Sequence, residues 1–586
     1  KVLAFTNGVQ DAAHQAGFIE ARNYRFTFRA AVQRVINELN REISLVDFQN
    51  EFKDYWIKNA DESKKKPVEA YIYKFFPSDH LGDVKIANYK KAEERFEPKF
   101  IEELNRRIDW EIVSEFGYNA VLGRTLEKTG STATYFDEED IKKTYDLLKP
   151  WMDANSLGVI SYPEFSRYLN AFLHRLRIRG GLHHPYLQAF RTGKSNYYLI
   201  TTNVNKQYFL LRNFGKKTRL PKFITDQFAS GVFDFTCKTT PSTNWFHVYF
   251  RKSFPLAQNN DSLVNEFYSR LLNTLSDPSV KLLDEKIAEG VRNFALNAEK
   301  IFLRKQVYTF KCNVCDHELH VAEPNSINHA SCINFRCIGH YDLMPFDDSE
   351  NYYKQVYNRS RSPRIYATEH TGLLERVDRE KKEYQFKNRP YFNSLNALVA
   401  TSTLEMGINI GDLNTTFNNS IPPQPSNFIQ RVGRAGRSSG SALIINFAAN
   451  EAHDQYYYQQ PTEMMMGEIN SPGCYLEAKE ILKRHFLAFC IDEWTKSDHV
   501  QNFIPVNFRL KPFNIEQVDL ADSTLFFNCI ITFIKKHEND WFSKFQERLK
   551  DYVSNEIFIE LRETIRTGLF YSSITKEFVA IKEEIK

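Results

Sequence analysis

Short apolar runs bounded by polar residues recur along the chain. Three of them, at residues 2–6, 395–400 and 442–447, are typical of strands buried in a parallel sheet, and a further strand is expected at 364–369. Residues 8–39 instead repeat alanines and other apolar residues at the spacing of a helix. Strands separated by helices predict an α/β domain with a parallel sheet flanked by helices.

A long segment between these strands follows a different pattern. Residues 41–300 are charged and mainly helical, so we expect an insertion large enough to hold domains of its own. Helices are predicted at 137–152 and 163–179, and strand-like segments follow between 197 and 212. This order fits a winged helix near 137–215, and it also fits a helical bundle.

Two arginines on the second of these helices are candidates for contact with nucleic acid. Arg175 and Arg179 lie four residues apart, so they share one face of the helix. In a winged helix this face would contact DNA phosphates, whereas in a helical bundle it would be a basic face in solvent.

Composition sets the scale of the molecule but says little about its partners. The chain has 586 residues, enough for several domains, and its net charge of +4 does not by itself argue for nucleic acid. No apolar run is long enough for a membrane span and no signal peptide opens the chain, so we expect a cytoplasmic protein with no membrane contact. The chain does not begin with methionine, and we expect a piece of a larger polypeptide.

Four of the eight cysteines have the spacing of a zinc ribbon, which we expect at residues 301–350. Cys312 and Cys315 form one pair, and Cys332 and Cys337 form the second. Two pairs of thiolates close a tetrahedron around Zn²⁺ without an open position, so the predicted ion is structural rather than catalytic. A nearby histidine could replace one cysteine, the candidates being His317, His320, His329 and His340.

The densest group of candidate functional residues follows the predicted strand at 395–400. Thr401 stands at the carboxyl end of this strand, where open α/β sheets place their ligands, and Gly407 allows backbone to approach a phosphate. Arg434 and Arg437 are expected on one face of a short helix, where two guanidinium groups suit an anion whose charge grows during a reaction. The alternative is an arginine-rich helix that faces solvent.

The strings ATSTLEMGINI at 400–410 and QRVGRAGR at 430–437 resemble motifs V and VI of superfamily 2 helicases. The resemblance implies that residues 1–40 and 351–448 together form the second RecA-like motor domain of such a protein. It implies roles for seven residues: Gln430, Arg434 and Arg437 reach the γ-phosphate of ATP, Glu405, Gly407 and Asn409 lie beside the nucleotide, and Thr401 contacts a nucleic-acid phosphate. Asn409 replaces the family's usual Asp and lacks its charge.

Other strings extend the resemblance. AFTNGVQDAAHQAGFIEAR at 4–22 is similar to motif IV, with Val9 in place of a common arginine. EHTG at 369–372 puts His370 and Thr371 where the superfamily contacts the nucleic-acid backbone, and a helix cap is the alternative reading of these two residues.

Three features point to a subgroup of bacterial helicases with a four-cysteine element, whose members act in mitomycin repair and phage defence. These are GRTLE at 123–127, the four cysteines, and YLEAKEILKRHFLAFC at 475–490. Residues 449–586 are expected to form a helical accessory region.

The sequence has no P-loop and no Asp-Glu-x-His box, so a first motor domain outside these residues is expected to bind most of the ATP and Mg²⁺. We therefore predict the C-terminal half of an ATP-dependent DNA helicase or translocase of bacterial anti-phage defence. Its expected partners are DNA, the first motor domain and other defence-system subunits. The alternatives are a zinc-containing nucleic-acid-binding scaffold with an inactive motor, and a translocase that moves along duplex without separating the strands.

Overall fold

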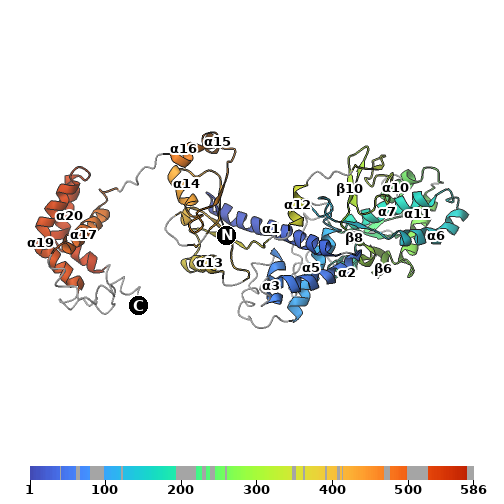
Figure 1. The fold of residues 1–586 in the computed structure, drawn as a ribbon, viewed down its shortest axis with the longest axis horizontal. Coiled ribbons are helices and arrows are strands. Elements are labelled where there is room, and N and C mark those ends of the chain that lie inside the picture. Colours follow the sequence, from blue (N-terminus) through green and yellow to red (C-terminus); the bar gives the residue numbers. More distant parts are fainter. Residues whose placement is uncertain are drawn as a thin grey trace. The chain divides into compact units, whose positions relative to one another are not determined.

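A computed structural model gives the fold of the chain, which forms two compact units, Lys1–Gly467 and Glu468–Lys586 (Figure 1). The structure describes residues 1–39, 41–60, 66–78, 98–120, 123–192, 220–227, 233–237, 244–257, 260–288, 290–345, 351–359, 363–389, 392–405, 410–411, 413–467, 475–497 and 526–576.

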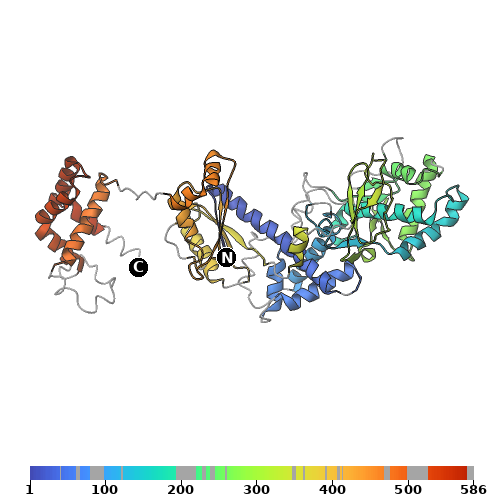
Figure 2. The same ribbon diagram turned by 45° about the horizontal axis from the view of Figure 1, so that its top comes forward.

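A five-stranded parallel sheet forms one part of the first unit, and its strand order is β12-β13-β1-β14-β15 (Figure 2). The first strand of the chain lies at the centre, paired with β13 on one side and β14 on the other. The α/β fold with a parallel sheet, predicted from the apolar runs, is confirmed. The strands are β1 (Val2–Phe5), β12 (Ala367–His370), β13 (Ala397–Ala400), β14 (Thr415–Asn419) and β15 (Leu443–Phe447).

Successive side chains of β1 pack into two separate cores. Ala4 packs with Ala12 and Ala16 of helix α1 (Val9–Glu38), whereas Leu3 and Phe5 belong to a cluster that contains Phe386 of α13 (Arg376–Asn388). Successive residues of a strand point to opposite faces, so α1 and α13 cover opposite faces of the sheet.

The last strand differs from its prediction. Residues 442–447 were expected to form a buried strand, but Leu443 is 58% exposed and Phe447 is 53% exposed. The strand is exposed because β15 lies at the edge of the sheet, with β14 as its neighbour on one side.

Three further helices belong to this region, α14 (Pro425–Val432), α15 (Ala452–Gln459) and α16 (Pro461–Met466). The last two lie beyond the predicted domain end at residue 448, yet Met464 of α16 packs against Phe428 of α14.

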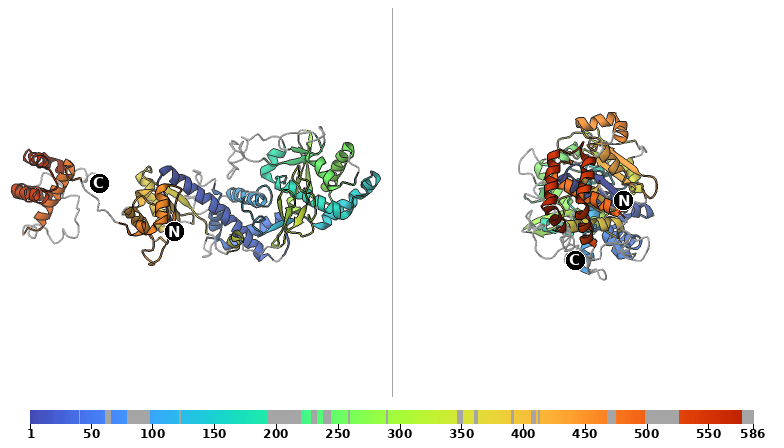
Figure 3. Two further views of the ribbon diagram at one scale, coloured as in Figure 1. Left: turned by 90° about the horizontal axis from the view of Figure 1, so that it is seen from above. Right: turned by 90° about the vertical axis from the view of Figure 1, so that its left-hand side faces the viewer.

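Helix α1 extends from the sheet into the insertion (Figure 3, left). Its first turns pack on the sheet, and its later residues Phe28, Val32 and Ile36 are part of the large insertion core. Helix α12 (Tyr352–Asn358) brings the chain back beside it, where Tyr353 stacks on Phe26 at a ring-centroid distance of 5.9 Å. One continuous helix therefore joins two cores.

The insertion was expected to be mainly helical, and it also contains two small sheets with strand orders β2-β8-β3 and β5-β4-β7-β6. Their strands are β2 (Ile43–Ser44), β3 (Ala133–Tyr135), β4 (Phe223–Thr225), β5 (Phe233–Phe235), β6 (Leu283–Ala288), β7 (Val291–Leu296) and β8 (Phe302–Arg304). The helical elements are α2 (Leu45–Asn59), α3 (Pro67–Phe75), α5 (Pro98–Glu115), α6 (Glu138–Ala154), α7 (Tyr162–Ile178), η2 (Pro185–Leu187), α8 (Gln188–Arg191), α10 (Trp245–Ser253), α11 (Asp261–Ser276) and η3 (Ala298–Lys300).

Helices α6 and α7 confirm the two helices predicted at 137–152 and 163–179. Asp137 caps α6 by accepting a hydrogen bond from the backbone N–H of Glu139, and Ser161 with Glu164 forms a capping box at α7. The strand-like segments predicted between 197 and 212 lie outside the described residues, so the winged helix stays a prediction.

The segment with the four cysteines contains a small antiparallel sheet of order β10-β9-β11, in which Cys312 ends β9 and the other three cysteines lie in the connecting loops. Its strands are β9 (Tyr308–Cys312), β10 (Glu318–Val321) and β11 (Tyr341–Leu343). Phe310 and Leu319 belong to the insertion core, so this ribbon is packed onto the insertion.

The described part of the second unit contains α17 (Lys479–Thr495), α19 (Phe526–Leu549) and α20 (Asn555–Arg566), which run side by side in the views of Figures 1 and 3. They enclose a core of their own around Phe486, Phe542 and Phe558. Among the described residues, no helix is both long and apolar enough to cross a membrane.

Candidate functional site

The carboxyl ends of neighbouring parallel strands bring three of the predicted residues together. His370 ends β12 and is paired with Ala400, the last residue of β13, so Thr371 and Thr401 follow at the same edge of the sheet. Thr401 is 8% exposed, and a short 3-10 helix, η4 (Ser402–Leu404), begins directly after it.

His370 and Thr371 have buried side chains in this structure. The His370 ring lies between Glu383 of α13, 2.8 Å from Nε2, and the Thr403 hydroxyl, 3.2 Å from Nδ1. This placement gives His370 a positioning role, because it ties η4 to α13. The alternative reading as a helix cap is wrong, because the residue that precedes α13 is Glu375.

Glu405 accepts hydrogen bonds from the segment that carries the arginine motif. Its buried carboxylate accepts hydrogen bonds from Arg431 Nε at 2.7 Å and from Asn427 Nδ2 at 2.8 Å, both on α14. Its backbone carbonyl accepts a hydrogen bond from Arg434 Nη2. Glu405 was predicted to bind the nucleotide, and here it holds α14 in place; Gly407 and Asn409 lie outside the described residues.

The arginine helix is shorter than predicted. Helix α14 ends at Val432, so Arg434 and Arg437 lie in the turn after it, and their predicted location on the helix is wrong. Two glycines explain the difference: Gly433 caps the helix, and Gly436 has a φ of 75° that turns the chain toward Leu413, whose carbonyl accepts its N–H at 2.9 Å.

The two arginines of this turn have different surroundings. Arg434 is buried, and its pKa is lowered by burial and by the positive charge of Arg437. Arg437 is exposed, and its Nε donates to the Gly433 carbonyl at 2.8 Å. Gln430, on the last turn of α14, is also exposed. Because the positive charges of Arg434 and Arg437 repel each other, binding an anion beside them would be favourable.

Arg431 is a buried structural residue of this arrangement that the sequence did not single out. Its side chain is 3% exposed, its partner Glu405 is 5% exposed, and its guanidinium lies 5.0 Å from the ring centre of Phe5 on the central strand. The string QRVGRAGR contains three arginines that look alike, and only the position of Glu405 separates the structural one from the other two.

The arginines predicted to contact phosphates in the insertion have local partners. The Arg175 guanidinium stacks on Trp245 at 3.7 Å from the ring centre, and its side chain is 11% exposed. Arg179, 35% exposed, lies 3.2 Å from Asp234. Arg175 therefore has a structural role here, and its predicted contact with nucleic acid has no support in this placement.

The four cysteine sulfurs converge, with all of them within 4.8 Å of one another. Sγ atoms of Cys312 and Cys337 are 3.5 Å apart, and those of Cys315 and Cys332 are 3.6 Å apart, close to the separation of about 3.8 Å expected around tetrahedral Zn²⁺. The Asn334 and Gly339 backbone N–H groups donate to Cys332 and Cys337, which favours thiolates. This donor set fits zinc.

Lys252 of α10 fastens the cysteine loops to the insertion. Its ammonium group donates to the carbonyls of Cys332, Asn334 and Cys337, the latter two at 3.1 and 3.0 Å. Of the four histidines considered as replacement ligands, His317 bonds to the Tyr341 hydroxyl at 2.9 Å and His320 to the Thr309 hydroxyl at 3.1 Å.

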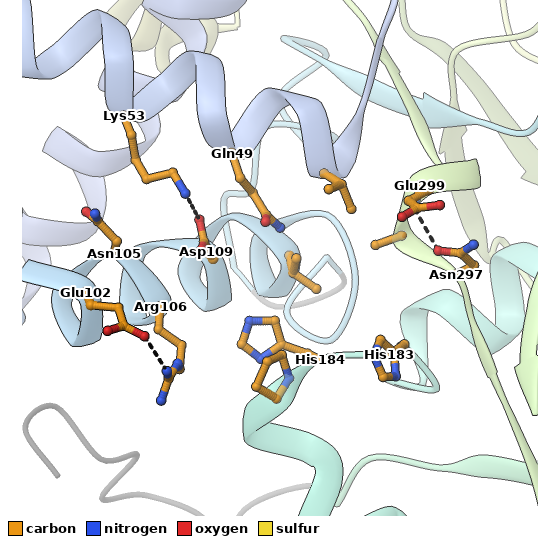
Figure 4. Close-up of a pocket in the computed structure, with 14 residues that line it drawn as sticks. Gln49, Lys53, Glu102, Asn105, Arg106, Asp109, His183, His184, Asn297 and Glu299 are labelled. Atoms are coloured by element: carbon orange, nitrogen blue, oxygen red, sulfur yellow. Dashed lines mark hydrogen bonds and ion pairs between the residues drawn. The ribbon is translucent and has the colours of Figure 1, made fainter. Parts of the chain in front are cut away.

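The insertion also contains a cavity of about 460 Å³ between α2, α5 and the segment before η2 (Figure 4). Its charged side chains pair with one another, Lys53 with Asp109 at 3.4 Å and Arg106 with Glu102 at 3.2 Å. Burial lowers the pKa of His184 in its wall to about 3, with a smaller contribution from His183, so this imidazole is neutral. The cavity has no excess of positive charge that would select a phosphate.

Comparison with known proteins gives a family match within the domain that contains the five-stranded sheet. Residues 346–439 match the model of the helicase conserved C-terminal domain, a range that includes β12, β13, β14, α14 and both arginines of the turn. Druantia protein DruE of Escherichia coli is 26% identical over 227 residues, which are 35% of this chain and 12% of that protein.

Two other relatives match shorter segments. An uncharacterized ATP-dependent helicase of Methanocaldococcus jannaschii is 40% identical over 127 residues, 21% of this chain and 18% of the relative. The ATP-dependent helicase HRQ1 of Saccharomyces cerevisiae is 33% identical over 98 residues, 17% of this chain and 8% of the relative. The aligned segments thus span less than a fifth of each relative. Residues 346–439 thus match the helicase conserved C-terminal domain, and the chain resembles the superfamily 2 helicases and Druantia protein DruE.

Proposed function

We propose that this chain contributes the second motor domain of an ATP-dependent DNA helicase or translocase. The observation that supports the proposal is the Glu405 arrangement, which holds Arg434 buried and leaves Arg437 exposed in one turn. A rigid base with one exposed guanidinium is what an arginine finger requires, since it must reach a phosphate and remain in place.

In this proposal ATP and Mg²⁺ are bound mainly by a first RecA-like domain outside these residues, and Arg437, Arg434 and Gln430 complete the pocket. The ion and the nucleotide supply the phosphoryl chemistry. This chain's guanidinium groups bind and orient the γ-phosphate and stabilise its charge. DNA would lie along the carboxyl edge of the sheet near Thr401, where the His370 contacts keep η4 in position.

The cellular setting follows from the resemblance to Druantia protein DruE and is part of the proposal: bacterial cytoplasm, anti-phage defence, and other subunits of the defence system as partners. The four cysteines are proposed to hold a structural Zn²⁺ in the ribbon.

The test is DNA-stimulated ATP hydrolysis by the complete polypeptide that contains this chain. Arg437→Ala is expected to lower kcat at least about 100-fold, because arginine fingers contribute about 10³–10⁵ in rate. Its unfolding midpoint should not change, because the side chain is exposed. Arg376→Ala, which removes an 85% exposed arginine from α13, is the matched control and should retain full activity. Equal rates for wild type and Arg437→Ala would refute the motor.

A scaffold with an inactive motor is the second candidate, and Asn409 supports it, because the amide lacks the charge of the family's usual Asp. A scaffold would bind DNA without hydrolysing ATP in the same assay. Unwinding of a forked duplex compared with displacement of a triplex strand separates a helicase from a translocase that keeps the duplex closed.

A further inference from the structure

Three metal-binding side chains converge on the ribbon outside the four-cysteine site. His340 and Asp342 are two residues apart along the strand that contains β11, so they project on the same side. The backbone N–H of His329 donates to the Tyr341 carbonyl at 2.7 Å, which brings the His329 ring beside them. One ligand atom from each of the three lies within 4.8 Å of the other two.

The distances already resemble those around an ion. Asp342 Oδ1 is 3.3 Å from His329 Nδ1 and 3.2 Å from His340 Nε2. Ligand atoms of tetrahedral Zn²⁺ are about 3.4 Å apart, because each is about 2.0–2.1 Å from the ion. We propose that His329, His340 and Asp342 form a second divalent-cation site, distinct from the cysteine site, with two imidazoles and one carboxylate as ligands.

Backbone hydrogen bonds hold the segments that carry the two histidine ligands. His329 has a φ of 63°, a left-handed conformation that costs a non-glycine residue energy, and the Tyr341–Ala330 backbone bond of 2.9 Å keeps the loop in it. Asn313 Oδ1 accepts a hydrogen bond from the backbone N–H of His340 at 3.1 Å, which ties the backbone of the second ligand to the loop between Cys312 and Cys315. The backbone that carries the two histidine ligands is thus held in place by the fold.

Two features make this site weaker than four thiolates and leave it open. The ligand side chains are 43–63% exposed, so the fourth position faces solvent and holds water. Asn313 Nδ2 lies 3.1 Å from His340 Nε2 and 3.2 Å from Nδ1, so an ion on Nε2 has to displace this amide contact. Reversible binding follows, in contrast to a buried structural ion.

The competing account is that Asp342 only accepts hydrogen bonds from two histidines. The number of metal ions bound per chain distinguishes a cation site from these hydrogen bonds. The complete chain is loaded with Zn²⁺, loosely bound metal is removed, and Co²⁺ is titrated in. Wild type should take up one further equivalent of Co²⁺ per chain, with d–d absorption and without thiolate charge-transfer bands.

Two variants and one control complete the test. His329→Gly removes a ligand and suits the left-handed backbone, and Asp342→Asn removes the carboxylate; each should bind Co²⁺ at least tenfold more weakly while the cysteine zinc remains. Asp316→Asn makes the same change of charge at an 80% exposed ribbon residue with a φ of 56°, and it should bind as wild type does.

Three results would each overturn the proposal: no uptake of Co²⁺ by wild type, unchanged affinity in either variant, or thiolate bands that show Co²⁺ replacing the cysteine zinc.

Discussion

Glu405 joins two segments of the sheet domain through an ion pair with Arg431 that is almost completely removed from water. Breaking a buried pair by removing one charge leaves the other without compensation, at a cost of about 3–5 kcal/mol. Glu405→Gln is therefore expected to lower the free energy of unfolding of the first unit by about this amount. Urea unfolding followed by hydrogen exchange of the sheet strands measures the change.

An exposed pair provides the control for this prediction. Glu380→Gln breaks the ion pair with Arg376, whose side chains are 60% and 85% exposed, and should change stability by less than about 1 kcal/mol. Replacing both buried partners by methionine should cost less than Glu405→Gln, because no lone charge remains. Equal shifts in Glu405→Gln and Glu380→Gln would show that the buried pair is not what holds α14.

The roles of some single residues could be predicted from the sequence, and those of others could not. Motif spacing was sufficient to select the turn with Arg434 and Arg437, and to place Thr401 at a strand end. It did not separate Arg431 from its neighbours, because the role of an arginine in a glycine-rich string depends on a carboxylate 26 residues earlier. Burial of His370 likewise depends on Glu383, which reaches it from a helix on the face of the sheet.

Helix α1 carries a carboxyl group whose charge is unfavourable in the folded state. Burial raises the pKa of Glu20 to about 7 from an ordinary value of 4.5, although the positive charge of Arg364 opposes the shift. Between these pH values the folded state binds more protons than the unfolded state, so stability should fall as pH rises from about 4.5 to about 7.

Glu20→Gln tests this prediction on the element that joins the two cores of the first unit. Thermal unfolding at pH 5 and pH 8 should show a smaller loss of stability with rising pH for Glu20→Gln than for wild type. Glu139→Gln, at an exposed position on α6, should retain the pH dependence of wild type. A wild-type slope in Glu20→Gln would contradict the assignment.

The ribbon should depend on its metal. Cys312 is fully buried and belongs to the insertion core, so Cys312→Ser is expected to remove the cysteine-bound zinc and to lower the thermal midpoint of the first unit. Metal content per chain and calorimetry measure the two effects. Cys237→Ser, at a half-buried cysteine outside the cluster, should retain the zinc. Full zinc occupancy in Cys312→Ser would remove this residue from the ligand set.

Elements with a clear period or cap could be predicted, whereas short strands could not. The predictions at 137–152 and 163–179 located α6 and α7 to within about two residues, and the caps at Asp137 and Ser161 mark where the two helices begin. Strands such as Ile43–Ser44 and Phe223–Thr225 are too short to show alternation, so the two sheets of the insertion were missed. An apolar run does not reveal a sheet edge, which is why β15 was expected to be buried.

At the scale of the whole molecule, the chain consists of two units, and the core of the second unit shares no residue with the cores of the first. The insertion core of the first unit contains residues of α1 and of the ribbon, so these parts should unfold together. The core of the second unit comes from α17, α19 and α20 and from the residues that follow α20. Separate cores predict separate unfolding transitions, because cooperativity extends only as far as shared packing.

Matched substitutions, one in each core, test this separation. Phe486 and Phe250 are both fully buried, and truncation of a buried phenylalanine to alanine costs about 3–5 kcal/mol. Phe486→Ala should lower the transition of the second unit alone, since its ring contacts Phe542, Phe545 and Phe570 within that unit. Phe250→Ala should lower only the transition of the first unit. Calorimetry with hydrogen exchange assigns each transition, and a single substitution that lowered both would mean that the two units fold as one.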